Sequence, residues 1–222
     1  MQIQIEHIQK KYRRKEVLKD ISLQASSGQC IGILGSNGAG KSTLLTILAG
    51  VLACDSGSFC CDGNDLLKNS RLRSQLVGYV PQGTPLMSEL NAWDNLSLWY
   101  EKSALKKELE CGVLNMLGIG EFLKTPVCKM SGGMKKRLAI GCAMASEPEI
   151  LLLDEPTAAL DLVCKENILE YFDAFRKRGG ILIISTHDEQ EIAMCDKCYI
   201  LREGRLEEYN YDGDIHRLAD AL

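Results

Sequence analysis

A glycine-rich stretch at residues 35–43 combines residue types that bind phosphate. It reads Gly-Ser-Asn-Gly-Ala-Gly-Lys-Ser-Thr and fits the pattern G-x-x-x-x-G-K-[ST]. Its glycines permit backbone angles that side chains disfavour, so successive N–H groups can turn towards a polyphosphate. Lys41 supplies a mobile positive charge for the β- and γ-phosphates, and the Ser42 hydroxyl can bind Mg²⁺. The stretch predicts a nucleoside triphosphate site formed by Gly35, Ser36, Asn37, Gly38, Ala39, Gly40, Lys41, Ser42 and Thr43.

The residues around this loop are typical of the elements that it needs. Residues 31–34 read as a short buried strand, whereas residues 43–49 follow a helical pattern. A helix that begins at the loop turns free N–H groups and the positive end of its dipole towards the phosphates. A glycine-rich turn that matched by chance would not come with a strand, a loop and a helix in this order.

Two adjacent carboxylates, Asp154 and Glu155, follow an apolar run at residues 150–153. The run predicts a strand that is buried on both faces, and carboxylates at its end are costly to leave without a partner. A Mg²⁺ ion held through Ser42 and the nucleotide gives Asp154 a partner and leaves Glu155 to orient or deprotonate a water molecule. The alternative is a pair of acids in a strand-ending turn, which the nearby phosphate loop disfavours.

Two further polar residues follow predicted strands. Gln82 comes after the strand at 76–80 and Pro81, and His187 comes after the apolar strand at 181–185. Ligands of open α/β sheets bind at the carboxyl ends of the strands, so both side chains are expected at the same edge as Asp154. A histidine after a strand is usually structural, but this position favours a contact between His187 and a γ-phosphate.

The stretch from residue 84 to residue 147 differs from the strand-rich remainder of the chain. Helical spacing of apolar residues predicts helices over 91–100 and 104–117, and we interpret the stretch as an inserted helical subdomain. Trp93 and Trp99 are expected in its core rather than against a ligand.

Ser131, Gly132 and Gly133 open another predicted helix, which reaches about residue 146. A serine and two glycines at a helix start offer free N–H groups to an anion. Serine is also a common helix cap, so the pattern alone leaves both interpretations open.

Alternating residues at 2–5 predict a strand that buries Ile3 and Ile5, and residues 17–23 repeat the alternation. These strands predict an antiparallel flank on a mixed, largely parallel α/β sheet. Basic residues surround Tyr12 between them. Its ring is either an incidental aromatic in a solvated turn or a stacking face for a purine.

Length and composition indicate one soluble domain over residues 1–222, with 45% hydrophobic and 25% charged residues. The formal net charge of −4 argues against a nucleic-acid-binding surface. The longest nearly apolar run, at residues 44–54, is shorter than the roughly 20 residues of a membrane span. The start of the chain lacks the pattern of a secretory signal. If a membrane is involved, we expect the chain to dock on a partner there.

The 10 cysteines show no spacing typical of a disulfide framework and indicate a reducing compartment. Cys195 and Cys198 form a C-x-x-C pair, but no second pair completes a zinc set. We expect Cys195 to end a helix and Cys198 to begin a strand, so that their side chains diverge and both are structural. A metal or redox role near His187 is the alternative.

Together these motifs resemble the ATP-binding cassette (ABC) ATPase family over essentially the whole chain. Residues 35–43 are similar to its Walker A loop, and residues 150–155 are similar to its Walker B strand. The other matches are Gln82 for the Q-loop, residues 131–133 for the signature motif, Asp161 for the D-loop, His187 for the switch histidine and Tyr12 for the aromatic that stacks on adenine. Walker A occurs in many NTPases, whereas a signature motif between Q-loop and Walker B is specific to this family.

The resemblance implies a P-loop NTPase core and an ATP-dependent dimer, in which each ATP lies between one Walker A loop and the partner's signature motif. It also implies a role for each matched residue. Lys41 and the loop amides hold the phosphates, and Mg²⁺ is bound by Ser42, Asp154 and Gln82. Glu155 is the general base, and His187 positions the γ-phosphate and water. The partner's site is completed by Ser131, Gly132 and Gly133, and Asp161 communicates across the interface.

The chain departs from the family pattern at Met130 and Met134, where Leu and Gln are usual, and at Ser36, where proline is frequent. None of these changes removes a phosphate ligand or the base, so ATP hydrolysis is still expected. The signature motif and residues 86–96 resemble the bacterial branch that serves drug, sodium, haem or lipid-linked exporters.

The resemblance therefore implies the cytoplasmic ATPase subunit of a transporter, held at the inner face of the membrane by a separate permease chain. The working dimer is either a homodimer or a heterodimer, and no nucleic-acid partner is expected. The alternative is a soluble ABC ATPase of a translation-related or cytosolic assembly system. The chain has one cassette, no coiled-coil insertion and no cysteine spacing for an iron–sulfur cluster.

Overall fold

A 10-stranded sheet runs through the computed structural model, which describes residues 1–158 and 160–222. The strand order is β5-β4-β1-β2-β10-β9-β3-β8-β7-β6. The strands are β1 (Gln2–Tyr12), β2 (Lys15–Ser26), β3 (Cys30–Leu34), β4 (Ser56–Cys61), β5 (Asn64–Asp65), β6 (Val77–Val80), β7 (Ile150–Asp154), β8 (Ile181–Ser185), β9 (Lys197–Arg202) and β10 (Arg205–Tyr209).

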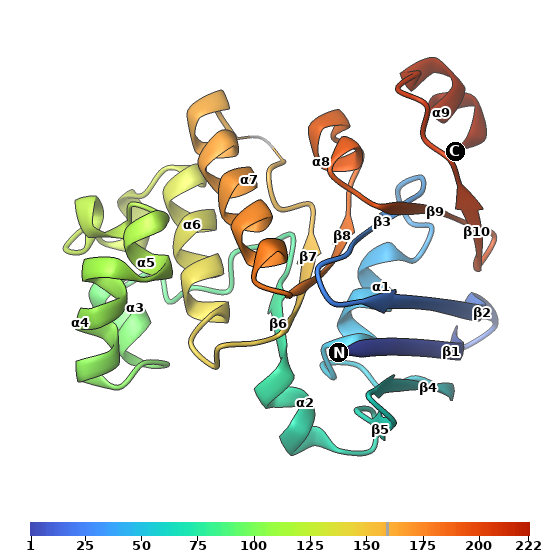
Figure 1. Ribbon diagram of the computed structural model, residues 1–222, viewed down its shortest axis with the longest axis horizontal. Coiled ribbons are helices and arrows are strands. Elements are labelled where there is room, and N and C mark those ends of the chain that lie inside the picture. Colours follow the sequence, from blue (N-terminus) through green and yellow to red (C-terminus); the bar gives the residue numbers. More distant parts are fainter. Residues whose placement is uncertain (159) are drawn as a thin grey trace.

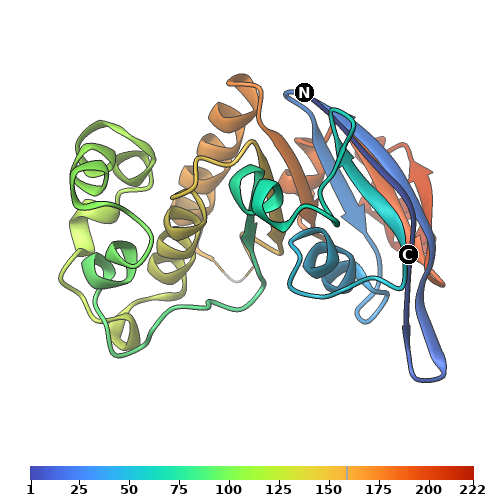
Figure 2. The same ribbon diagram turned by 90° about the horizontal axis from the view of Figure 1, so that it is seen from below.

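The helices are distributed unevenly along this sheet. They are α1 (Lys41–Leu48), α2 (Ser70–Leu76), α3 (Ala92–Ser97), α4 (Lys102–Cys111), α5 (Val113–Met116), α6 (Gly132–Ala143), α7 (Leu162–Lys177), α8 (Glu189–Ala193) and α9 (Ile215–Ala221), with 3-10 turns η1 (Ile119–Phe122) and η2 (Val127–Lys129). Helices α3 to α6 gather at one end of the molecule, and α7 lies between them and the sheet (Figure 1). In the turned view the green and yellow helices again stand apart from the blue and red strands (Figure 2).

The two parts of the sheet differ in strand direction. Strand β3 pairs in parallel with β8 and β9, and β7 pairs in parallel with β6 and β8. Strand β1 instead pairs antiparallel with β2 and β4. This is the predicted mixed, largely parallel α/β sheet with an N-terminal antiparallel flank, so the fold class is confirmed.

The parallel strands are buried on both faces. Every residue of β3, β7 and β8 is buried, as their apolar runs predict. Because successive side chains of a strand point to opposite faces, Ile150 and Leu152 pack into the apolar cluster around α1, whereas Leu151 and Leu153 pack with residues of α6 and α7. In the antiparallel flank Ile3 and Ile5 are buried, as expected. These layers bring the carboxyl ends of β3, β7 and β8 to one edge.

The predicted helix over residues 104–117 is two helices, α4 and α5. Gly112 separates them with an extended backbone, at φ −103° and ψ −157°. The Glu108 carboxylate accepts a hydrogen bond from the Val113 N–H at 2.8 Å. A side chain therefore caps the new helix where the backbone ladder is interrupted.

Two other details differ from the sequence prediction. Trp99 is 65% exposed, so its expected core position is wrong, whereas Trp93 packs against the core. Helix α2 was not predicted. It has 7 residues, none of them fully buried, and its apolar pair at helical spacing, Leu72 and Leu76, packs partly buried against the core, so the pattern is too short to indicate a helix.

Candidate active site

The phosphate loop at residues 35–43 leads from β3 into α1. Two of its glycines are required by the backbone. Gly35 has a φ of 153°, and a Cβ atom there would lie 2.6 Å from the carbonyl oxygen of Leu201. Gly40 has a φ of 114° at the start of α1. The loop can make these turns only with glycine, and the turns allow N–H groups of the loop to face a ligand.

Lys41 is the buried cation of the loop, with 6% of its surface exposed. Its Nζ donates hydrogen bonds to the carbonyl oxygens of Gly35, at 2.6 Å, and Ser36, at 3.2 Å. Burial lowers the pKa of the Lys41 ammonium, and the charges of Glu155 and Asp154 oppose this shift. The loop thus holds a partly desolvated positive charge beside the two carboxylates, where it can bind phosphate oxygens strongly.

A cavity of about 470 Å³ opens over the loop. This volume falls within the range of small-molecule and cofactor sites. The residues that line it are Val17, Asn37, Gly38, Gly40, Lys41, Ser42, Thr43, Gln82 and Glu155. The fold therefore brings the phosphate loop together with Gln82 and Glu155, which lie far away in the sequence.

The two carboxylates after β7 have different surroundings. Asp154 is 3% exposed and accepts a hydrogen bond from the hydroxyl of Ser185, the residue opposite it on β8. Glu155 has a φ of 46°, in the left-handed region, and its N–H donates to the Ser185 carbonyl at 3.0 Å. Such a backbone costs free energy in a residue with a side chain and persists where the surroundings fix it. This turn directs Glu155 into the cavity while Asp154 stays in the strand.

Two side chains from other elements hold the Glu155 carboxylate. Gln82 donates from Nε2 to Oε2 at 2.7 Å, and Nε2 of His187 lies 2.9 Å from Oε1. The Glu155 side chain is 13% exposed and the His187 side chain 49% exposed. Each carboxylate oxygen therefore has its own partner, and the group is fixed at the cavity wall beside the phosphate loop.

The donor set of this cavity fits Mg²⁺ bound together with a nucleotide. Ser42 and Gln82 line the cavity, and the Asp154 charge acts on Lys41 of the same loop. Among the described residues no group of three or more His, Cys, Asp or Glu side chains forms a metal site of its own. Mg²⁺ usually takes only one or two carboxylates and completes its shell with phosphates and water. When bound, the ion would neutralise phosphate charge and hold the reacting phosphate in place.

The signature motif lies on a different part of the surface. Ser131 caps α6 by accepting from the Met134 N–H at 3.2 Å, and Ser131 and Gly132 are exposed. A Cβ atom at Gly133 would lie 3.9 Å from Oδ2 of Asp161, which caps α7. The structure thus brings the signature motif next to Asp161 but not into the cavity that Lys41 lines.

Tyr12 is also outside that cavity. It ends β1, is 46% exposed, and its ring centroid lies 5.6 Å from Nζ of Lys10. Val17 of the neighbouring strand reaches the cavity, whereas Tyr12 is absent from its lining. In this conformation the ring does not line the cavity over the phosphate loop.

The sequence analysis missed two buried charged residues near the site, Lys136 and Glu191. Glu191 is 1% exposed and accepts hydrogen bonds from the N–H of Thr157, at 3.0 Å, and from its hydroxyl, at 2.5 Å. Burial raises the pKa of Glu191, and the bonds from Thr157 oppose the shift. It joins the segment after His187 to the segment after Glu155. Each missed residue stands among other polar residues in the sequence, so no local pattern indicated burial.

The expected divergence of Cys195 and Cys198 is wrong. A Cβ atom at Gly32 would lie 3.0 Å from the Sγ of Cys195 and 3.2 Å from that of Cys198. The Cys30 and Cys195 sulfurs are 3.5 Å apart. The hydrogen bond to Cys195 and burial together raise the pKa of Cys198. The thiols converge because Gly32 leaves room for them beside β3.

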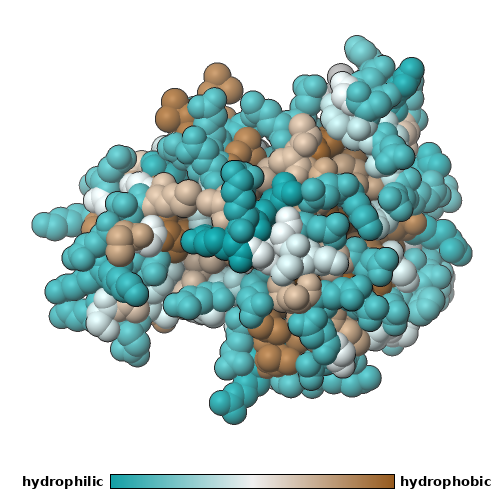
Figure 3. Space-filling model, viewed as in Figure 1, coloured by the Kyte–Doolittle hydropathy of each residue, from teal (hydrophilic) through white to brown (hydrophobic). Residues whose placement is uncertain are grey.

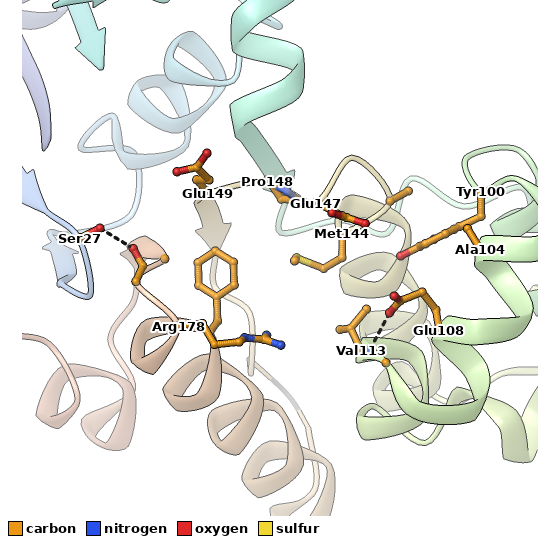
Figure 4. Close-up of a pocket in the computed structure, with 15 residues that line it drawn as sticks. Ser27, Tyr100, Ala104, Glu108, Val113, Met144, Glu147, Pro148, Glu149 and Arg178 are labelled. Carbon is orange, nitrogen blue, oxygen red and sulfur yellow. Dashed lines mark hydrogen bonds between the residues drawn. The ribbon is translucent and has the colours of Figure 1, made fainter. Parts of the chain in front are cut away.

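A second cavity, of about 430 Å³, lies at the amino ends of β7 and β8, across the sheet from the phosphate loop. Tyr100 and Glu108 form one wall, and Arg178 projects from the other side (Figure 4). The carboxylates of Glu147 and Glu149 also line it. This excess of negative charge disfavours a triphosphate, so the nucleotide belongs in the cavity over the loop.

Comparison with known proteins decides the family. The sequence model of a family described as "ABC transporter" matches residues 18–158. The chain belongs to this family. It is an ATP-binding cassette with ATPase activity, in agreement with the resemblance noted in its motifs.

The cassette is similar to ATP-binding proteins of several bacteria. It is 34% identical over 209 residues to the linearmycin resistance ATP-binding protein LnrL of Bacillus subtilis (strain 168), which covers 92% of this chain and 67% of the relative. It is 31% identical over 213 residues to the lantibiotic transport ATP-binding protein SrtF of Streptococcus pyogenes, which covers 95% of this chain and 92% of the relative.

Solved structures agree with the fold. A dimeric ATP-binding cassette in a post-hydrolysis state, bound to ADP and Pi, has a TM-score of 0.84 and 26% identity, covering 94% of this chain and 98% of that one. A nucleotide-free cassette from an ABC transporter has a TM-score of 0.85 at 22% identity, covering 99% and 96% of the two chains, and supports the fold alone. Within the residues described, no helix is long and apolar enough to cross a bilayer.

Proposed function

We propose that this cassette hydrolyses Mg²⁺-bound ATP as the motor of a membrane transporter, in a single nucleotide-binding domain over residues 1–222 with a helical subdomain at about residues 84–147. The observation that carries the proposal is the Glu155 carboxylate, held by Gln82 and His187 in the cavity of the phosphate loop. A fixed carboxylate beside a phosphate site is placed to orient and deprotonate a water molecule.

The roles of the other residues are proposed from their places in and near the cavity and from the family resemblance. Lys41 and the N–H groups of the loop bind phosphate oxygens, since both lie at the cavity wall. Ser42, Asp154 and Gln82 hold Mg²⁺, and His187 positions the γ-phosphate and the attacking water. Catalysis would then rest on electrostatic positioning of an in-line transfer to water rather than on a covalent intermediate.

A second cassette would complete the site. Ser131 and Gly132 of the signature motif are exposed, and the motif lies outside the cavity of its own chain, so it is free to meet the nucleotide of a partner. Leu162 and Val163, just after Asp161, are 74% and 68% exposed. Brown side chains project over the start of α7 in Figure 3. Exposed apolar groups that adjoin the signature motif support a contact surface there. Tyr12 remains the proposed stacking partner of the adenine, although it does not line this cavity.

The direction of transport is proposed from the relatives. The names of LnrL and SrtF refer to linearmycin resistance and lantibiotic transport, and a relative at 33% identity is called a Nod factor export protein. We therefore propose export through a separate permease chain, with this cassette at the inner face of the cell membrane. A relative at 31% identity is called a sulfate/thiosulfate import protein, so the membrane partner must be identified directly.

The test is an affinity pull-down of tagged Glu155→Gln from detergent-solubilised native membranes in the presence of ATP. A polytopic membrane protein in stoichiometric amount would support the transporter motor. The same variant without nucleotide and a Lys41→Ala variant with ATP are the controls, and each should show whether capture depends on ATP. Ribosomes or soluble assembly factors without a membrane protein would contradict the proposal and favour the soluble alternative.

A further inference from the structure

Lys136 is a buried cation that connects α6 to the segment of Gln82. Only 4% of its surface is exposed. Its Nζ donates hydrogen bonds to the carbonyl oxygen of Pro81, at 3.1 Å, and to that of Gln82, at 3.3 Å. A buried ammonium group is costly unless it is paired, so this position must be stabilised by its neighbours.

Those neighbours include the acidic residues of the active site. The charges of Asp154, Glu191 and Glu155 favour the ammonium form of Lys136, whereas burial lowers its pKa. Lys136 and Lys41 are thus the two buried lysines of the described residues on which Asp154 and Glu155 act. Lys41 belongs to the phosphate loop, but Lys136 belongs to the helix that begins with the signature motif.

Gln82 is consequently held through both its backbone and its side chain. Its backbone carbonyl accepts from Lys136, and its side chain donates to Glu155 at 2.7 Å. Lys136 follows Gly133 by about one turn of α6. A continuous series of hydrogen bonds therefore runs from the signature helix through Gln82 to the carboxylate that faces the nucleotide cavity.

We propose that Lys136 is a positioning residue that couples the signature motif to the Gln82–Glu155 pair. When the signature motif engages the nucleotide of a partner cassette, a shift of α6 is transmitted through Lys136 to Gln82 and then to Glu155. The inference rests on the proposed dimeric function and adds the residue that links the two half-sites within one chain. A lysine that only filled space between α6 and residues 81–82 would have no such effect.

Three substitutions separate these roles. Lys136→Met keeps the aliphatic stem and removes both the donors and the charge. Lys136→Gln keeps a donor without the charge, and Lys136→Arg keeps both. Lys106→Met, at an exposed position of α4, is the matched control for the loss of a lysine charge.

For each variant we would measure binding of a fluorescent ATP analogue, kcat, the Hill coefficient for ATP and the midpoint of thermal unfolding. We expect Lys136→Met to bind the analogue within about twofold of the wild type, to lose kcat by about tenfold or more, and to show a Hill coefficient close to one. Lys136→Arg should recover most of kcat and of the cooperativity, whereas Lys106→Met should match the wild type.

Wild-type kcat and cooperativity in Lys136→Met would overturn the proposal. An equal loss in all three variants that follows their unfolding midpoints would also overturn it, because this is the result of a merely structural role. If Lys136→Met does not fold, the other two variants test the proposal. Cooperativity that is lost in Lys136→Gln and kept in Lys136→Arg supports coupling, and any other pattern rejects it. Wild-type and Glu155→Gln samples are run in parallel to distinguish failure of this proposal from failure of the proposed function. A wild type that hydrolyses ATP cooperatively, together with an unchanged Lys136→Met, rejects this proposal alone. A wild type without cooperative hydrolysis would reject both.

Discussion

The Nε2 atom of His187 lies 2.9 Å from Oε1 of Glu155 across the carboxyl ends of β8 and β7. The other oxygen of this carboxylate accepts from Gln82 at 2.7 Å. Three segments that are far apart in the sequence thus meet at one group. This relationship supports the proposed role of Glu155 as the base, with its neighbours holding the carboxylate in its orientation.

Replacement of the histidine should therefore slow the chemical step rather than weaken binding. We expect His187→Ala to lower kcat about 100-fold, because the carboxylate loses one of its two partners and the γ-phosphate loses a positioning group. Binding of a fluorescent ATP analogue should stay within about threefold of the wild type. His216→Ala, at an exposed position of α9, serves as the control. A His187→Ala enzyme with wild-type kcat would contradict this role.

The Mg²⁺ requirement should depend on Ser42. We expect Ser42→Ala to raise the Mg²⁺ concentration for half-maximal ATPase activity by about tenfold, because an oxygen ligand is lost. Removal of the ion by EDTA should stop turnover in both proteins. Ser74→Ala, on α2, removes a hydroxyl that donates to the Arg71 carbonyl oxygen and should leave the requirement unchanged. An unchanged Mg²⁺ titration in Ser42→Ala would rule out this ligand.

The backbone of the phosphate loop makes a separate prediction. Gly35→Ala would place a Cβ atom 2.6 Å from the Leu201 carbonyl oxygen at a φ of 153°. We expect this change to destabilise the protein by roughly 1–3 kcal/mol and to weaken ATP binding, because the loop must move away from β9. Denaturant unfolding and ATP titration measure the two effects. Gly120→Ala, where a Cβ atom has open space, should change neither. A Gly35→Ala protein of wild-type stability would show that the loop tolerates the side chain.

Glu191 predicts a pH dependence of stability. Burial raises its pKa above the ordinary value of 4.5, so at pH values between the unfolded-state and folded-state pKa the folded state holds a proton that the unfolded state releases. Its stabilising contribution is complete below pH 4.5 and is lost as the pH rises through the folded-state pKa. Relative to Glu191→Gln, the free energy of unfolding of the wild type should therefore fall across this range. Denaturant unfolding from pH 4.5 upward measures the difference, with exposed Glu110→Gln as the control. A constant difference between wild type and Glu191→Gln would contradict the raised pKa of Glu191.

The sequence could predict the elements whose patterns are local. The apolar runs of β3, β7 and β8 indicated buried strands, and all three are fully buried. The rule that strand ends share an edge also predicted that Gln82 and His187 would lie at the edge of Asp154, and both contact the adjacent Glu155. These predictions succeeded because each depends on a short stretch of residues or on a general property of parallel sheets.

Features that depend on distant backbone atoms could not be predicted. Lys136 is bonded to carbonyl groups that lie 55 and 54 residues away, and any residue type supplies such groups. The convergence of Cys195 and Cys198 depends on the space that Gly32 leaves, which spacing alone does not reveal. Trp99 was expected in the core because of its size and helical spacing, but α3 ends before it and leaves it exposed.

The most direct test of the central claim is single-turnover ATP hydrolysis by Glu155→Gln, measured together with ATP binding. Glu149 is exposed and precedes the amino end of β7, whereas Glu155 follows its carboxyl end. Glu149→Gln is therefore the matched control and should hydrolyse ATP like the wild type. If Glu155 is the base, Glu155→Gln will bind ATP within about threefold of the wild type, hydrolyse it at least about 100-fold more slowly and accumulate as a nucleotide-bound dimer. Turnover by Glu155→Gln at nearly the wild-type rate, with binding intact, would contradict this account of the site.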